Sequence, residues 1–166
     1  DLLWSADGDD VLRAGVGDDT LWGGHDADIL FGGRGDDELA GGTGNDTQYG
    51  GDGADRIWGG EGADVLSGEL GDDHLDGGVG ADTLEGGGGA DRLIFGDGSD
   101  VLTYESAASG ISVSLKTGLG TQGDALGDIL QDRPEELIGS AHNDFLEGSD
   151  FADYIKGGDG NDIIHG

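Results

Sequence analysis

Apolar side chains recur at every ninth position along most of this chain. Residues 5–103 divide without a gap into eleven nine-residue repeats of the form Gly-Gly-x-Gly-x-Asp-x-apolar-x, of which residues 77–85 (GGVGADTLE) are one. The eighth position is Leu or Ile in ten of the eleven repeats, and Gln48 is the exception. Because side chains alternate between the two faces of a strand, this residue points inward while the seventh and ninth point outward. The pattern predicts short strands, each with one core side chain, separated by glycine-rich turns.

The sixth position carries an aspartate in all eleven repeats. If two repeats form a coil of 18 residues, turns on the same side stack about 4.8 Å apart, and their aspartates form two rows. The first row is Asp10, Asp28, Asp46, Asp64, Asp82 and Asp100, and the second row is Asp19, Asp37, Asp55, Asp73 and Asp91. Neighbouring carboxylates in such a row repel one another, whereas a divalent cation between each pair would make the row attractive. We therefore predict cation sites along both rows.

Glycines at the first, second and fourth positions allow positive φ, and such turns expose backbone carbonyls, which are the hard oxygen ligands that calcium prefers. Three further repeats between residues 139 and 165 carry Asp144, Asp153 and Asp162, and we expect Asp144 and Asp162 to share one ion. Together with five ions in the first row and four in the second, this shared ion brings the expected number to about ten calcium ions. The expected carbonyl ligands are those of Gly15, Gly17, Gly24, Gly33, Gly35, Gly42, Gly44, Gly51, Gly53, Gly60, Gly62, Gly71, Gly78, Gly80, Gly87, Gly89, Gly96, Gly98, Gly158 and Gly160.

The charge balance supports a cation as the partner. The net charge is −30, from 37 acidic and 7 basic residues, which excludes nucleic acid as a partner because phosphate binding needs clustered Lys and Arg. No run of about 18 apolar residues is present, so we expect no membrane span. The chain has no Cys, so disulfides cannot stabilise it.

These glycine and aspartate positions resemble the nonapeptide of RTX proteins, the haemolysin-type calcium-binding repeat family. The resemblance implies an all-β fold, a right-handed parallel β-roll in which six residues form a turn, three form a strand, and two repeats complete a coil. It also implies a secreted, extracellular protein exported by a type I secretion machinery. Because each repeat offers only one core side chain, we expect the chain to be unfolded without calcium and to fold when calcium binds.

The repeat pattern fails between residues 104 and 138. Ile111, Val113 and Leu115 alternate with polar residues, which predicts a strand, and Asp128 lies in a degraded repeat that begins at Gly123. We interpret residues 1–103 as an eleven-repeat roll, residues 104–138 as an irregular, wider coil of the same solenoid, and residues 139–166 as three further repeats of an array that continues in a longer protein.

The expected function is a calcium-binding repeat module of a secreted bacterial protein. Two alternatives remain open, an accessory domain of a secreted polysaccharide-modifying enzyme or hydrolase, and a segment of an adhesin. We expect no catalytic residues within this chain, because it has no GxSxG elbow and its four histidines occupy unrelated positions of the repeat. Trp22 and Trp58, with Arg56 and Arg92 on the same outer face, suggest an acidic polysaccharide as a further partner. The opposite face carries an apolar strip that could pack on another domain of the parent protein: Val11, Ile29, Phe31, Tyr49, Val65 and Val101.

Overall fold

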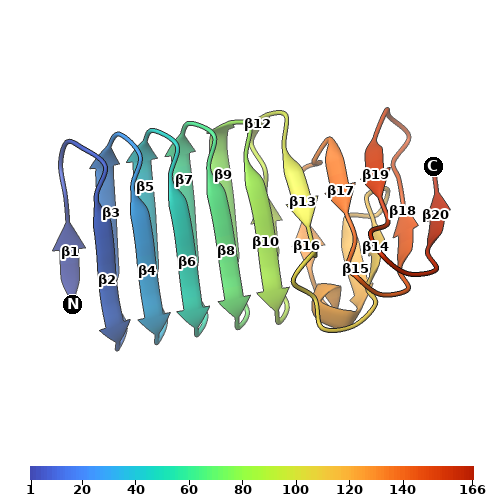
Figure 1. Ribbon diagram of the computed structural model, residues 1–166, viewed down its shortest axis with the longest axis horizontal. Helices are drawn as coiled ribbons and strands as arrows, with labels where there is room; N and C mark the ends of the chain where they lie inside the picture. Colours follow the sequence, from blue (N-terminus) through green and yellow to red (C-terminus); the bar gives the residue numbers. More distant parts are fainter.

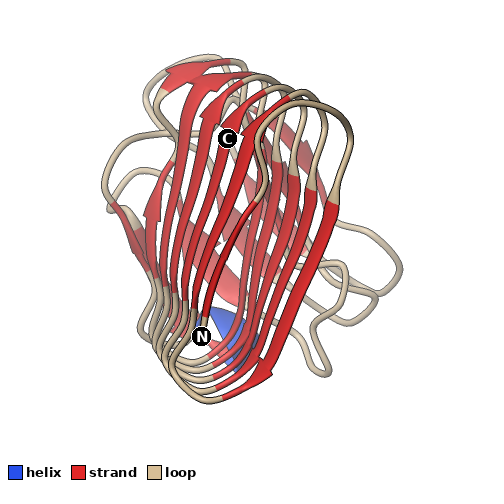
Figure 2. Ribbon diagram, turned by 90° about the vertical axis from the view of Figure 1, so that its left-hand side faces the viewer, coloured by secondary structure: helices blue, strands red, loops and turns tan.

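The computed structural model describes residues 1–166 as an all-β parallel solenoid built from two facing sheets (Figures 1 and 2). The 12-stranded sheet contains, in spatial order, β1 (Leu2–Trp4), β3 (Thr20–His25), β5 (Glu38–Thr43), β7 (Arg56–Glu61), β9 (His74–Gly80), β11 (Arg92–Ile94), β16 (Ile129–Leu130), β15 (Leu119–Gln122), β14 (Ser112–Ser114), β18 (Phe145–Glu147) and β20 (Ile163–His165), with β12 (Asp97–Gly98) paired to β9. The 8-stranded sheet contains β19 (Tyr154–Lys156), β17 (Glu136–Ile138), β13 (Val101–Thr103), β10 (Thr83–Gly88), β8 (Val65–Leu70), β6 (Thr47–Asp52), β4 (Ile29–Arg34) and β2 (Val11–Val16).

Each coil of the leading repeats contains 18 residues, as two repeats per coil require. Leu21 pairs with Leu39 and Leu39 with Ile57, so every inward side chain lies over the one two repeats away. Most strands here have six residues rather than the expected three. The reason is that the parallel ladder continues into the glycine turn, where Gly24 pairs with Gly42. The turn that reverses the chain is correspondingly shorter than the motif suggests.

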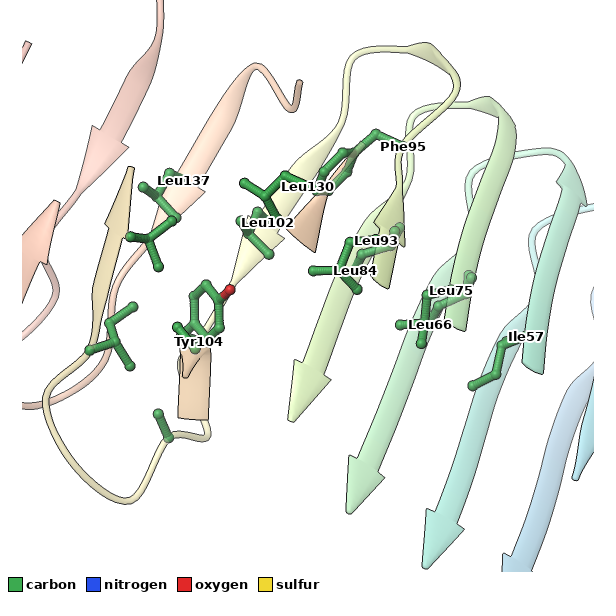
Figure 3. Close-up of a cluster of buried hydrophobic side chains, with 14 of the residues drawn as sticks. Ile57, Leu66, Leu75, Leu84, Leu93, Phe95, Leu102, Tyr104, Leu130 and Leu137 are labelled. Carbon is green, nitrogen blue, oxygen red and sulfur yellow. The ribbon is translucent and has the colours of Figure 1, made fainter. Parts of the chain in front are cut away.

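The core is a narrow double column of side chains from the eighth positions (Figure 3). Leu21, Leu39 and Leu75 are among the fully buried members. Gln48 is also fully buried, and its Nε2 donates a hydrogen bond to the carbonyl of Trp58 at 2.8 Å. Its Oε1 has no partner, but the strands on either side keep their register at Gln48, so the amide does not distort the coils.

Residues 104–138 add strands to the same two sheets through a longer excursion of the chain. Ile129 of β16 pairs with Arg92, 37 residues earlier instead of 18. Between them, β14 and β15 form an antiparallel hairpin, and β15 also pairs antiparallel with β16. The expected strand at Val113 is confirmed as β14, but the antiparallel pairing was not anticipated. The short 3₁₀ helix η1 (Gly123–Ala125) lies in this excursion, and none of the structure's helices has the length and apolar character to cross a membrane.

Candidate metal centre

The aspartates of both rows stack along the solenoid, each at the start of a strand. In each of nine consecutive pairs, Oδ1 of one aspartate accepts a hydrogen bond of 2.7–2.9 Å from the backbone N–H of the aspartate one coil earlier. Asp55, for example, receives this bond from Asp37 and donates its own N–H to Asp73. One carboxylate oxygen therefore holds the coils together, and the other remains available.

The second carboxylate oxygen, Oδ2, has no hydrogen-bond partner although it is buried. This holds for nine row members: Asp19, Asp28, Asp37, Asp46, Asp55, Asp64, Asp73, Asp82 and Asp91. Native proteins rarely leave a buried polar atom unpaired, because its lost hydration costs about 1–3 kcal/mol, and more for a charged group. Because an unpaired oxygen recurs on every coil, an electropositive partner such as a cation would be favourable beside each one.

Backbone oxygens converge on the same space. A methyl group placed on Gly59 would lie 2.5 Å from Asp64 Oδ2 and 2.5 Å from the carbonyl oxygen of Gly77 in the next coil. The fourth-position glycines, such as Gly17 and Gly35, hold φ at +119° and +127°, and their carbonyl oxygens accept no hydrogen bond. At Gly59 only glycine leaves the space beside Asp64 Oδ2 open, because a Cβ would fill it.

The donor set suits a hard cation held partly by backbone. No three Asp, Glu or His side chains converge on one point, so carbonyls must supply part of any coordination shell. Calcium takes six to eight oxygen ligands from carboxylates and backbone carbonyls in flexible geometry, whereas magnesium demands a small octahedron and keeps its waters. The paired Oδ2 and carbonyl oxygens therefore fit calcium, which would supply the positive charge that the rows lack.

The electrostatics of the rows point the same way. Burial raises the pKa of Asp55 and of Asp64 to about 6, and that of Asp73 to about 7. Burial, together with the neighbouring Asp128 carboxylate, raises the pKa of Asp91 to about 8. Without a cation these carboxyl groups therefore lose their protons only between about pH 6 and 8, above the ordinary range of aspartate, and a bound divalent ion would favour the ionised form.

Two features of the turns were not recognised from the repeat alone. Side chains at the fifth position also link successive coils. Asp36 Oδ1, for example, accepts a hydrogen bond of 2.9 Å from the backbone N–H of Ala54 one coil later. Asp26 and Glu69, which replace glycines, nevertheless keep positive φ values of 72° and 73°. The turn conformation is therefore imposed by the stacking of coils even where the residue disfavours it.

The three aspartates predicted near the C-terminus have different surroundings. Asp162 lies in a glycine turn like those of the leading repeats, and its Oδ1 accepts the N–H of Asp144 at 3.1 Å. The carboxylates of Asp144 and Asp153 instead accept hydrogen bonds from Ser140 and Ser149. Asp128 and Glu135 were not among the predicted ligands. Their carboxylates accept hydrogen bonds from the backbone N–H groups of Asp91 and Asp100 and so extend the two rows.

The outer faces carry the predicted aromatic residues. Trp22, Ala40 and Trp58 lie in register on β3, β5 and β7, with a groove of about 400 Å³ between the indoles. Arg56 pairs with Glu38 at 3.6 Å, and Arg92 donates to the side chain of Gln131 at 2.6 Å. On the opposite sheet, which carries the apolar strip, the rings of Phe31 and Tyr49 stack with their centroids 5.1 Å apart.

Comparison with known families agrees with this geometry. The family described as RTX calcium-binding nonapeptide repeat (4 copies) matches residues 4–39, 31–66, 40–75, 67–102 and 138–166. The matched segments include both aspartate rows and leave out the irregular excursion. No curated protein matches the chain.

Proposed function

Because the chain belongs to the RTX calcium-binding nonapeptide repeat family, we propose that calcium binds between successive turns of both aspartate rows and that this binding folds the module. The observation that carries the proposal is the unpaired, buried Oδ2 on nine row aspartates. Each ion would be held by Oδ2 atoms and turn carbonyls, as the donor set allows. In the family context, the module belongs to a secreted bacterial protein that leaves the cell unfolded, through type I secretion, and folds where calcium is abundant.

A calcium titration of the metal-free chain, followed by far-ultraviolet circular dichroism, tests the coupling of binding to folding. At neutral pH we expect only a weak β signal in chelator, a cooperative gain at millimolar calcium, and no gain with magnesium. A chain that is equally folded in chelator would refute the proposal.

Two alanine variants test the stacked arrangement of the sites. Asp55 has row neighbours on both sides, whereas Asp10 lies at the start of its row and has only Asp28 beside it. Asp55→Ala should therefore raise the calcium midpoint more than Asp10→Ala, because it removes a ligand from two ions rather than one. Equal midpoints would contradict the arrangement in rows.

As a second candidate, the groove between Trp22 and Trp58 suits stacking on a sugar ring. The two indoles are two strands apart, about 10 Å, and Ala40 leaves the space between them open. The sequence suggested that the positive charge of Arg56 would attract an acidic polysaccharide. Glu38 pairs with Arg56 and offsets this charge, so the groove favours a neutral sugar. Neutral oligosaccharides should change the Trp fluorescence of the calcium-loaded chain, and a Trp22→Ala, Trp58→Ala double variant should abolish the response. Trp4→Ala, outside the groove lining, is the control.

A further inference from the structure

The aspartate rows continue into residues 104–156, but there the chain itself supplies the partners that the leading repeats lack. Asp128 takes the next place in the second row, since its Oδ1 accepts the N–H of Asp91 at 3.0 Å. Glu135 takes the next place in the first row, accepting the N–H of Asp100 at 2.9 Å. Asp153 follows Glu135, because Tyr154 N–H donates to the Glu135 carbonyl as each seventh position does in the repeats.

Tyr104 closes the second row. Its hydroxyl donates to Asp128 Oδ2 at 2.7 Å, and the ring is almost fully buried in the core. This is the oxygen that stays unpaired in the row aspartates before it. A hydroxyl donor therefore stands where a cation would have to bind.

Two serines close the next turns in a different way. Ser140 donates its backbone N–H and its hydroxyl to the two oxygens of Asp144, both at 2.7 Å. Ser149 donates its N–H to Asp153 Oδ2 at 2.6 Å, and its hydroxyl also contacts that carboxylate. Both serines replace the second-position glycine, and neither turn contains a residue with positive φ. The carbonyls of these turns are therefore not presented as they are in the glycine turns.

Arg133 brings a fixed positive charge to the end of the first row. Its guanidinium lies 2.8 Å from Asp153 Oδ1 and 3.7 Å from Glu135 Oε1. Asp153 has only 5% of its side chain exposed, and its carboxylate accepts hydrogen bonds from both Ser149 and Arg133. A divalent cation between these carboxylates would have to displace the guanidinium or face its repulsion.

The same part of the chain has a denser apolar core than the repeats. Nine of the twenty buried hydrophobic residues lie between Tyr104 and Leu146, including Ile111 and Val113 (Figure 3 shows part of this cluster). The repeats contribute about one such residue for every nine. More buried apolar area per residue offsets more of the entropy of ordering.

Resting on the proposed function of the repeats, we infer that residues 104–156 form a calcium-independent segment, in which Tyr104, Arg133, Ser140 and Ser149 take the place of the bound ion. This segment holds its fold in chelator, whereas the leading repeats require calcium. Asp128, Asp144 and Asp153 then act as structural acceptors rather than calcium ligands.

Hydrogen–deuterium exchange of the full chain, resolved by peptide and measured in chelator and in millimolar calcium, tests this division. We expect residues 104–156 to exchange at least about tenfold more slowly than an unfolded chain in chelator, with little change on adding calcium. Peptides from residues 5–103 should gain protection only with calcium. Protection of residues 104–156 that appears only with calcium overturns the inference and leaves the proposed function intact. A leading segment that never responds to calcium overturns the proposed function, while protection of residues 104–156 in chelator still supports the inference.

Variants test which residues replace the ion. Ser140→Gly with Ser149→Gly restores the glycines of the repeat, and Arg133→Gln removes the fixed charge while keeping a long side chain. Each should remove the protection of residues 104–156 in chelator, and calcium should restore it in the serine variant. The matched controls are Ser67→Gly, whose serine makes no hydrogen bond to a carboxylate, and Arg34→Gln, whose arginine pairs with Asp52 on the exposed surface. Full protection of both test variants in chelator, equal to that of the controls, would contradict the assigned roles.

Discussion

Two glycines at the same position of the repeat separate backbone strain from the close stacking of coils. Gly15 and Gly51 have φ values of +116° and +120°, so alanine should cost about 1–3 kcal/mol in conformational strain at either site. At Gly15 an added Cβ meets nothing within 4 Å, because no earlier coil lies beneath it. At Gly51 the Cβ would overlap the carbonyl oxygen of Gly33, far inside the separation of about 3.5–4.0 Å that non-bonded heavy atoms prefer.

The backbone strain therefore cancels when the two variants are compared, and the difference reports the overlap with the Gly33 carbonyl. Overpacking of this kind typically costs a further 1–3 kcal/mol or so, since the coils of β4 and β6 must separate to admit the methyl group. For a chain of this length that corresponds to a melting temperature about 2–12 °C lower for Gly51→Ala than for Gly15→Ala. The Gly33 carbonyl is also an expected calcium ligand, so the calcium midpoint of Gly51→Ala should rise as well.

Thermal unfolding at saturating calcium, followed by circular dichroism, compares the two variants with the parent chain. Each variant should melt below the parent, and Gly51→Ala should melt lowest. Equal melting temperatures for the two variants would show that the carbonyl does not approach the glycine as closely as the structure has it, and would leave the positive φ as the reason for glycine at this position.

Three further predictions follow from single residues. Glu69→Gly should increase the free energy of unfolding by about 1 kcal/mol in calcium-saturated urea denaturation, because it relieves a positive φ of 73°; a decrease would contradict the strain. Gln48→Leu should stabilise the chain by about 1–2 kcal/mol in the same assay, because the buried Oε1 has no partner; a loss of stability would mean that the bond to the Trp58 carbonyl matters more. In chelator, the β signal should be greatest below about pH 4 and fall as the pH rises through about 6 to 8. The folded chain binds protons more tightly than the unfolded chain, since the pKa values of Asp55, Asp73 and Asp91 rise from 3.8 to about 6, 7 and 8; circular dichroism without any change over this range would contradict the burial of these carboxyl groups.

The nonapeptide determined most of the fold and the two rows by itself. A period of nine with two repeats per coil places each residue over the one 18 positions away, so Leu39 must meet Leu21 and Ile57, and Asp55 must meet Asp37 and Asp73. Contacts that repeat along the chain can be predicted from one repeat, because every coil packs against neighbouring coils of the same sequence pattern.

Only the tertiary structure decided how the rows end. The bonds from Tyr104 to Asp128 and from Arg133 to Asp153 span 24 and 20 residues and belong to no period. They depend on the excursion that inserts the antiparallel hairpin of β14 and β15, whose path no local pattern specifies. The sequence shows an Asp-rich chain throughout, but which carboxylate oxygens lack a partner depends on the donors that distant segments bring beside them, because a hydrogen bond requires contact within about 3 Å.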